Sequence, residues 1–196
     1  MKTIGAAVLV FVSISMPAFA DQAAAGKPSE TRVQDVQDVQ ELTATYSASF
    51  HAGRTANAIS EAEQALAAAE QLYSPEDEHV AQVLNDLGHF RRVHGDFAVA
   101  EALHRRALAI RDRVFHSDGP SVVQSLNNLA KVYVAQGRFV EAAPLYQRSL
   151  PIMERNLPPM HPHLLQVLEQ YEDVLRHEGK SPEADPIIAR MKLKKS

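Results

Sequence analysis

Cysteine and tryptophan are absent from the 196 residues, and after residue 20 no hydrophobic run is long enough to span a membrane. Without cysteine the chain cannot carry a lipid anchor on an N-terminal cysteine, and it suits an oxidising compartment without needing a disulfide. The sequence also lacks HExxH, GxSxG and a glycine-rich phosphate loop, which are motifs of common catalytic sites. We therefore expect neither enzymatic activity nor a cofactor.

An excess of positive charge is absent as well. The chain has 20 Lys and Arg against 24 Asp and Glu, a formal net charge of −4. Removal of residues 1–20 takes away one base, Lys2, which leaves 19 basic against 24 acidic residues and a net charge of −5. This balance gives no electrostatic reason to bind nucleic acid or an anionic membrane.

The first twenty residues have the three parts of a secretory signal peptide. Lys2 is a short positive region, Ile4 to Ile14 form an apolar region, and Ala18-Phe19-Ala20 is a small-x-small cleavage site before Asp21. A buried first helix is the alternative, but the flanks of the apolar run fit a signal better. We predict that residues 1–20 are removed and that the mature protein is periplasmic or secreted.

The rest of the chain repeats itself every 42 residues. The clearest markers are four glycines at this spacing, Gly53, Gly95, Gly137 and Gly179. In the third copy two helical stripes flank the glycine, one with Leu126, Leu129, Ala130 and Tyr133, the other with Phe139, Ala142, Leu145, Tyr146, Ser149 and Leu150. Residues 21–36 are expected to form a flexible lead-in and the start of the first helix. We place the copies at about 37–78, 79–120, 121–162 and 163–196.

The order of large and small residues in the third copy resembles the tetratricopeptide repeat (TPR). The usual repeat has 34 residues, whereas the longer period, the LNNLA of residues 126–130 and the pair His161-Pro162 resemble the kinesin-light-chain type. HEAT-like arrays have similar periods but lack this placement of Gly and Ala. The resemblance implies an all-α, right-handed solenoid of about eight helices in four pairs, with a concave face that binds peptide.

Local signals predict where several helices begin and end. We expect residues 21–32 to be disordered, because they mix small and polar residues with a Gly and a Pro. Ser74-Pro75-Glu76 and Ser181-Pro182-Glu183 are predicted to start helices. The last helix is expected to end in Lys192, Lys194 and Lys195. Pro144 and Pro151 interrupt the second helix of the third copy, so we expect a kink or an early end near residues 147–151.

A polar stripe beside the apolar one carries the candidate binding residues. It holds Gln124, Asn127, Asn128 and Lys131 in the third copy, Gln82, Asn85, Asp86 and His89 in the second, and Gln166, Glu169, Gln170 and Asp173 in the fourth. One of its positions is glutamine in all four copies: Gln40, Gln82, Gln124 and Gln166. Amides can pair with the backbone of an extended peptide whatever its sequence.

We therefore predict a site that binds an extended or helical segment of a protein partner. Its residues are Gln82, Asn85, His89, Arg92, Gln124, Asn127, Asn128, Lys131 and Gln166, of which His89, Arg92 and Lys131 would select partners by charge. Replacing Asn127 and Lys131 by Ala should weaken binding and leave the thermal midpoint nearly unchanged. The alternative is that the amides form the solvated side of a helix or bond between adjacent repeats.

Two other functions stay open. The solenoid could self-associate through its first or last copy as a structural scaffold of the cell envelope. A metal-binding or enzymatic role of the nine histidines is more remote, because His89 and His94 are five residues apart and do not share a helix face. The resemblance also makes His161-Pro162 a turn between repeats, and no residue set matches the two-lysine carboxylate clamp of some TPR domains.

Overall fold

A computed structural model describes residues 29–115, 118–182 and 185–193, and these residues form eight α-helices and no strand. The helices are α1 (Ser29–His51), α2 (Thr55–Leu72), α3 (Glu78–His94), α4 (Phe97–Val114), α5 (Pro120–Ala135), α6 (Phe139–Asn156), α7 (Pro162–His177) and α8 (Pro186–Leu193). The predicted all-α class and number of helices are confirmed. The predicted signal peptide and residues 21–28 lie outside the described residues.

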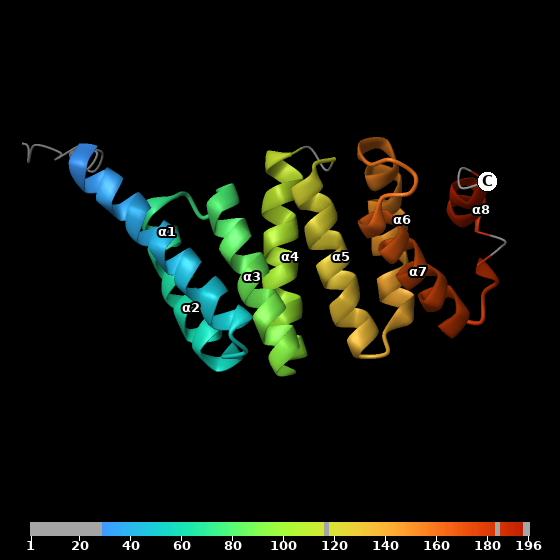
Figure 1. Cartoon of the computed structure of the whole chain (residues 1–196), viewed down its shortest axis with the longest axis horizontal. Helices are drawn as coiled ribbons and strands as arrows, with labels where there is room; N and C mark the ends of the chain where they lie inside the picture. Colours follow the sequence, from blue (N-terminus) through green and yellow to red (C-terminus); the bar gives the residue numbers. More distant parts are fainter. Residues whose placement is uncertain (1–28, 116–117, 183–184, 194–196) are drawn as a thin grey trace, which may run out of the picture.

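The helices pack in pairs, and the pairs follow one another in a row (Figure 1). α1 packs on α2, α3 on α4 and α5 on α6. Contacts between α2 and α3, α4 and α5, and α6 and α7 join successive pairs, while the short α8 packs against α6. This arrangement is the solenoid that the repeat predicted.

The four repeated glycines end the first helix of each pair. All four have a positive φ, between 71° and 98°, and a Cβ at any of them would meet nothing within 4 Å. Their backbone conformation, rather than a lack of space, therefore requires glycine. The residue after each glycine donates its N–H to the carbonyl five residues earlier, at 2.8–2.9 Å in all four turns.

Two apolar clusters form the core of the described residues. The cluster of α5, α6, α7 and α8 contains the predicted stripe, with Leu126 and Ala130 fully buried and Tyr133 5% exposed. The other cluster combines residues of α1 to α4, among them Tyr46 and Leu84. Because each cluster draws on neighbouring pairs, no pair buries its apolar stripe alone.

Ion pairs between helices repeat with the same period of 42 residues. Arg106 of α4 pairs with Glu70 of α2, and Arg148 of α6 pairs with Asp112 of α4. In the same way, Arg113 pairs with Glu76 and Arg155 with Asp118. Each such partly exposed pair contributes about 0–1 kcal/mol. Their repetition shows that the second pair packs on the first in the same register as the third pair packs on the second.

Three helix starts differ from the sequence prediction. α1 already includes Ser29, so residues 29–32 are helical. Acid side chains, rather than the predicted serines, cap the other two helices. Asp77 accepts from the N–H of His79 at 2.8 Å, and α3 begins at Glu78. Asp185 accepts from the N–H of Ile187 at 2.9 Å, and α8 begins at Pro186. Lys192 lies in α8, whereas Lys194 and Lys195 lie outside the described residues.

The predicted early end of α6 is wrong, because the helix runs through both prolines to Asn156. Each proline leaves the carbonyl four residues earlier without its helical donor, at Val140 and at Gln147. Val140, Pro144 and Gln147 are all exposed. Water can hydrate these carbonyls on the outer side of the solenoid, while the buried side of α6 holds the helix in place.

Candidate functional site

The predicted binding residues lie on α3, α5 and α7, the first helices of the second, third and fourth pairs. The structure divides them into two groups. The amides of the first group are used inside the fold, within a repeat or between neighbouring repeats. The second group faces an open groove. Their role in peptide binding stays a prediction for both groups.

Arg111 of α4 holds two of the four repeated glutamines. Its side chain is fully buried, and its Nη2 donates to Oε1 of Gln82 at 2.7 Å. Its Nη1 donates to Oε1 of Gln124 at 3.0 Å, and its Nε donates to Glu78 at 3.1 Å. Further bonds go to Oγ of Ser125 and to the carbonyl of Ser121. Arg111 thus joins α3 to α5 and fixes both glutamines between the repeats.

The three asparagines of the stripe also bond within the fold. Asn128 donates to Oδ1 of Asn85 at 3.0 Å, so that the third repeat bonds to the second. Asn127 is 2% exposed and accepts a hydrogen bond from Ser149 of α6 at 2.7 Å. Asn85 is 1% exposed. The amides of Asn85 and Asn127 therefore serve the packing of the helices.

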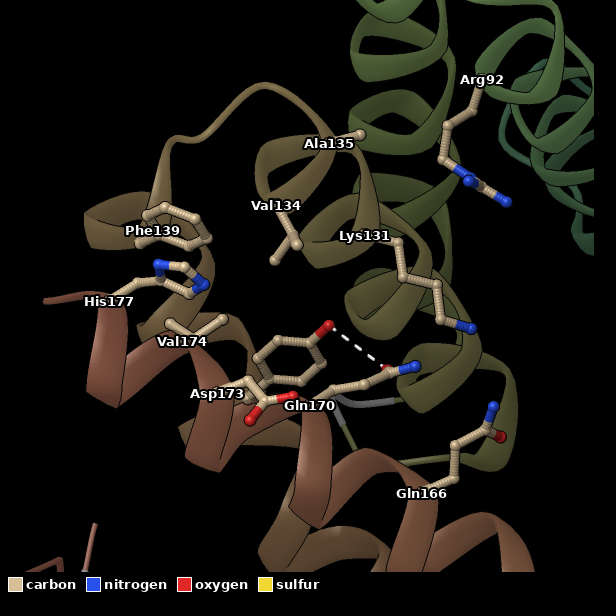
Figure 2. A pocket seen from close by; sticks show the side chains of 11 residues that line it. Arg92, Lys131, Val134, Ala135, Phe139, Gln166, Gln170, Asp173, Val174 and His177 are labelled. Atoms are coloured by element: carbon tan, nitrogen blue, oxygen red, sulfur yellow. Dashed lines mark hydrogen bonds between the residues drawn. The ribbon is translucent and has the colours of Figure 1, made fainter.

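The open part of this face is a groove of about 680 Å³, which we call the α5–α7 groove (Figure 2). It is lined by Arg92, Lys131, Val134, Ala135, Phe139, Tyr146, Gln166, Gln170, Asp173, Val174 and His177. In Figure 2 Arg92 and Lys131 lie on the side of α3 and α5, and Gln166, Gln170 and Asp173 lie on α7. The groove thus has a cationic side and a side of amides and one acid.

Arg92 and Lys131 are half-buried cations that form no ion pair with the described residues. Burial lowers the pKa of both, and the charge of Arg92 lowers the pKa of Lys131 further. Nη2 of Arg92 lies 3.4 Å from Nδ1 of His89. Two cations held near each other without an acid favour an anionic group in this part of the groove.

The α7 side of the groove mixes free and bonded groups. Gln166 is exposed, whereas Gln170 accepts a hydrogen bond from the hydroxyl of Tyr146 at 3.4 Å. Asp173 pairs with Arg176 at 2.7 Å, which leaves its charge partly compensated. At the end near the glycine turn, His177 stacks on Phe139 with ring centroids 4.2 Å apart. The groove therefore offers an amide, a phenol and an aromatic stack beside the cations.

Sequence reasoning missed the aromatic rings of this groove, which belong to Phe139, Tyr146 and His177. Phe139 and Tyr146 belong to the apolar stripe of the second helix, which predicts core positions, and Tyr146 is indeed 1% exposed. His177 is the last residue of α7 and carried no signal of its own. All three lie in the groove because α6 and α7 pack against each other, which a single repeat does not reveal.

A buried histidine lies behind the same face. His104 of α4 is 0% exposed, and a Cβ at Gly88 of α3 would come within 2.9 Å of its ring. Neither ring nitrogen has a hydrogen-bond partner among the described residues. Burial, together with the charges of His89, Arg92, Arg111 and Lys131, lowers the pKa of His104 to about 3. The ring is therefore neutral at physiological pH.

A second, smaller hollow of about 270 Å³ lies beside α5, α6 and the start of α7. Val123, Ile152, Met153 and Leu157 make it mainly apolar, and Gln124, Asn156 and His163 add polar groups. Met153 is one period after Arg111. The hollow thus occupies the part of the third repeat where the second repeat has its guanidinium network.

Within the part of the chain that the structure describes, no three His, Asp or Glu side chains are grouped so that they could hold a metal ion.

None of the helices among residues 29–115, 118–182 and 185–193 is both long and apolar enough to cross a membrane.

Comparison with known sequence families agrees with this architecture. The sequence model of the tetratricopeptide repeat matches residues 44–113, 80–155 and 121–186. The chain belongs to the tetratricopeptide repeat family. No curated protein matches the sequence. The TPR fold provides a scaffold for interactions between proteins, and proteins built on it are generally not enzymes.

Solved structures with the same fold include repeats of the kinesin-light-chain type, as the 42-residue period predicted. BtubC (BKLC) from P. vanneervenii aligns with a TM-score of 0.70 and 22% identity, over 80% of this chain and 63% of that one. The nearly identical TPR-like repeats of a kinesin light chain from Podosopora anserina align with a TM-score of 0.71 and 21% identity, over 79% of this chain and 73% of that one. The TPR protein thus spans less than two thirds of BtubC.

Proposed function

We propose that this TPR protein is exported and binds an extended segment of a protein partner, rich in acidic side chains, in the α5–α7 groove. The observation that carries the proposal is the pair Arg92 and Lys131. Both are half-buried in the groove, and neither pairs with an acid among the described residues. The proposed export requires that residues 1–20 act as a signal peptide.

The groove has the groups that such a segment needs. An acidic side chain between Arg92 and Lys131 would replace solvent at two cations that form no ion pair with the described residues. Gln166 can pair with the segment's backbone, since its side chain is exposed. Val134, Phe139 and Val174 give an apolar surface at the end near the glycine turn.

Binding can be tested with labelled model peptides. The mature protein, residues 21–196, is titrated with a fluorescein-labelled octapeptide of alternating Glu and Ala, and with its Gln-Ala and Lys-Ala counterparts. We expect the Glu peptide to bind tightest and the Arg92→Ala/Lys131→Ala variant to lose at least about tenfold in affinity, since hydrogen bonds to charged groups contribute about 1.5–3 kcal/mol. Arg54→Ala, an exposed cation in the α1–α2 turn, is the matched control and should bind like wild type. Equal binding of all three peptides would contradict the proposal.

Affinity capture from the envelope fraction of the source organism then identifies the partner. A protein retained by wild type and by Arg54→Ala, but lost by Arg92→Ala/Lys131→Ala, supports the groove as the binding surface. Capture of its own chain alone by all variants favours the self-associating scaffold instead. N-terminal sequencing of the protein from that fraction checks export, which predicts a mature chain that begins at Asp21.

A further inference from the structure

We propose that the smaller hollow beside α5, α6 and the start of α7 binds a long aliphatic side chain, methionine or leucine, of the acidic segment in the α5–α7 groove. This inference rests on the proposed function, because it names a second feature of the same partner. The basis is a comparison with the preceding repeat, where the side chain of Arg111 occupies the corresponding place.

The hollow lies where the preceding repeat holds a guanidinium. Arg111 is fully buried there, and its Nε donates to Glu78 at 3.1 Å. One period later the corresponding residues are Met153 and Pro120, and both line the hollow. Because methionine is shorter than arginine, a space of about 270 Å³ remains beside it. An apolar cavity of roughly 150 Å³ is already large enough for a benzene ring, so this hollow has room for one long side chain.

The walls of the hollow have changed from polar to apolar. Its buried residues are Val123, Ile152 and Met153, whose exposed fractions lie between 2% and 6%. None of the described residues that line it is an acid, since Pro120 stands where the preceding repeat has Glu78. A guanidinium from a partner would therefore be buried without a counter-charge, which is unfavourable. An aliphatic side chain instead gains free energy by leaving water.

Two amides at the mouth of the hollow can hold the backbone that carries such a side chain. Nδ2 of Asn156 donates to the carbonyl of Ile152 at 2.8 Å, and its Oδ1 can accept from a ligand N–H. Oε1 of Gln124 accepts from Arg111 at 3.0 Å, and its Nε2 can donate to a ligand carbonyl. Both side chains are exposed. An apolar floor with a few polar groups around it is typical of ligand pockets.

The hollow continues the α5–α7 groove toward the first turns of α5 and α7. On α7, His163 borders the hollow and Gln166, three residues later, lines the groove on the same side of the helix. Figure 2 shows Gln166 in the part of the groove away from Phe139. On α5, Gln124 of the hollow and Lys131 of the groove are seven residues apart, which is about 10 Å along the helix axis. Because an extended chain spans at most about 3.6 Å per residue, the aliphatic residue is at least about three positions from the acid.

The experiment uses unlabelled nonapeptides that displace the labelled Glu-Ala octapeptide from the mature protein. Each has a central Glu in a background of Ala and Gln, with acetylated and amidated ends. The first peptide carries Met at both ends, four positions from Glu, so that it can bind in either direction. The second has the same composition with Met on both sides of Glu. In the third and fourth, the end positions are Arg and Ala.

Wild type should bind the peptide with terminal Met about tenfold more tightly than the one with terminal Ala, as expected for a buried aliphatic side chain. The peptide with Met next to Glu should bind like the Ala peptide, because its methionines cannot reach the hollow while Glu lies between Arg92 and Lys131. The Arg peptide should gain less than the peptide with terminal Met, because no acid lines the hollow.

Pro120→Glu restores the acid of the preceding repeat and reverses this preference. Pro120 is exposed and is the first residue of α5, where the helix dipole favours a negative charge. In this variant the Arg peptide should gain at least about threefold in affinity, and the peptide with terminal Met should lose affinity, since a charge-assisted hydrogen bond replaces an apolar contact. Pro75→Glu makes the same change at an exposed proline before α3 and should bind all peptides like wild type.

Three results overturn the inference: equal affinity of wild type for all four nonapeptides, a methionine effect that is the same at both positions, or a Pro120→Glu variant with the wild-type preference. The first two need no protein variant, so they do not depend on whether a substitution is tolerated. Failure of wild type to bind the Glu-Ala octapeptide contradicts the proposed function instead.

Discussion

Two junctions of the solenoid, that of α3, α4 and α5 and that of α5, α6 and α7, have the same arrangement of helices. They differ in the residue at one repeated position. Arg111 and Met153 stand 42 residues apart, and both are buried. Arg111 binds Glu78 and two glutamines, whereas Met153 lines an apolar hollow in which Pro120 stands one period after Glu78. Among the described residues, the side chain of Met153 takes part in one weak hydrogen bond, which Asn127 donates to its sulfur at 3.7 Å.

The difference explains why the groove opens at the C-terminal half of the solenoid. Arg111 binds the amide oxygens of Gln82 and Gln124, so both oxygens are engaged inside the fold, although the Gln124 side chain is exposed. Met153 has no donor for the next glutamine of the series, and Gln166 remains exposed in the groove. The residue at this single position of the repeat thus decides whether a glutamine oxygen is bound inside the fold.

The largest effect is expected when Arg111 of the first junction is replaced by methionine, the residue that the second junction has at this position. Arg111→Met removes the donors of Glu78, Gln82 and Gln124, of which Glu78 and Gln82 are half-buried. We expect a loss of about 3 kcal/mol in the free energy of unfolding, because truncating one partner of a buried charged network leaves the others uncompensated. Urea unfolding measures the loss. Arg113→Met, which breaks the exposed pair with Glu76, should cost less than about 1 kcal/mol. Equal stabilities of the two variants would show that the network contributes nothing net.

The sequence was sufficient to predict the helices and their arrangement in pairs. The glycine spacing and the two apolar stripes predicted the pairs of helices, since both follow from local rules of helix periodicity and left-handed turns. The helix starts at Asp77 and Asp185 were missed because serine and aspartate cap helices equally well. Which of two nearby caps is used depends on packing that local sequence does not contain.

The candidate site was predicted less well, because burial across a repeat junction is not a local property. Arg111 and Arg113 look alike in sequence, yet Arg111 is 0% exposed and Arg113 66%. A signal was available, since the positions one period before and after Arg111 hold Ala69 and Met153, both apolar. A charge at a core position of a repeat predicts a buried network, and hence that its polar neighbours are occupied.

The same two junctions differ at a second position, which predicts an acid effect of intermediate size. His104 packs on Gly88, where the next repeat has Tyr146 and Ala130. The folded state lowers the pKa of His104 from 6.5 to about 3, so its stabilising effect is complete above pH 6.5 and is lost as the pH falls toward 3. We expect wild type to lose about 2 kcal/mol of unfolding free energy between pH 7.5 and pH 5 from this residue.

Urea unfolding at several pH values checks this effect. His104→Leu removes the titrating ring and keeps an apolar side chain against Gly88, so its stability should change less over the same pH range. His94→Leu replaces an exposed histidine near the end of α3 and should keep the wild-type pH dependence. If His104→Leu and wild type lose stability in parallel, the acid sensitivity arises elsewhere.

A last comparison concerns two residues that have equivalent places in the polar stripe. Asn127 and Lys131 are four residues apart on α5, but Asn127 is bonded to Ser149 and 2% exposed, whereas Lys131 faces the groove. Asn127→Ala should therefore cost about 1–3 kcal/mol, because it leaves the buried hydroxyl of Ser149 with only the more distant carbonyl of Tyr146, at 3.3 Å, as acceptor. Lys131→Ala should stay within about 0.5 kcal/mol of wild type in stability. In the peptide titration the order reverses, since only Lys131 offers its charge to the ligand. A stable Asn127→Ala that loses binding would return that amide to the binding surface.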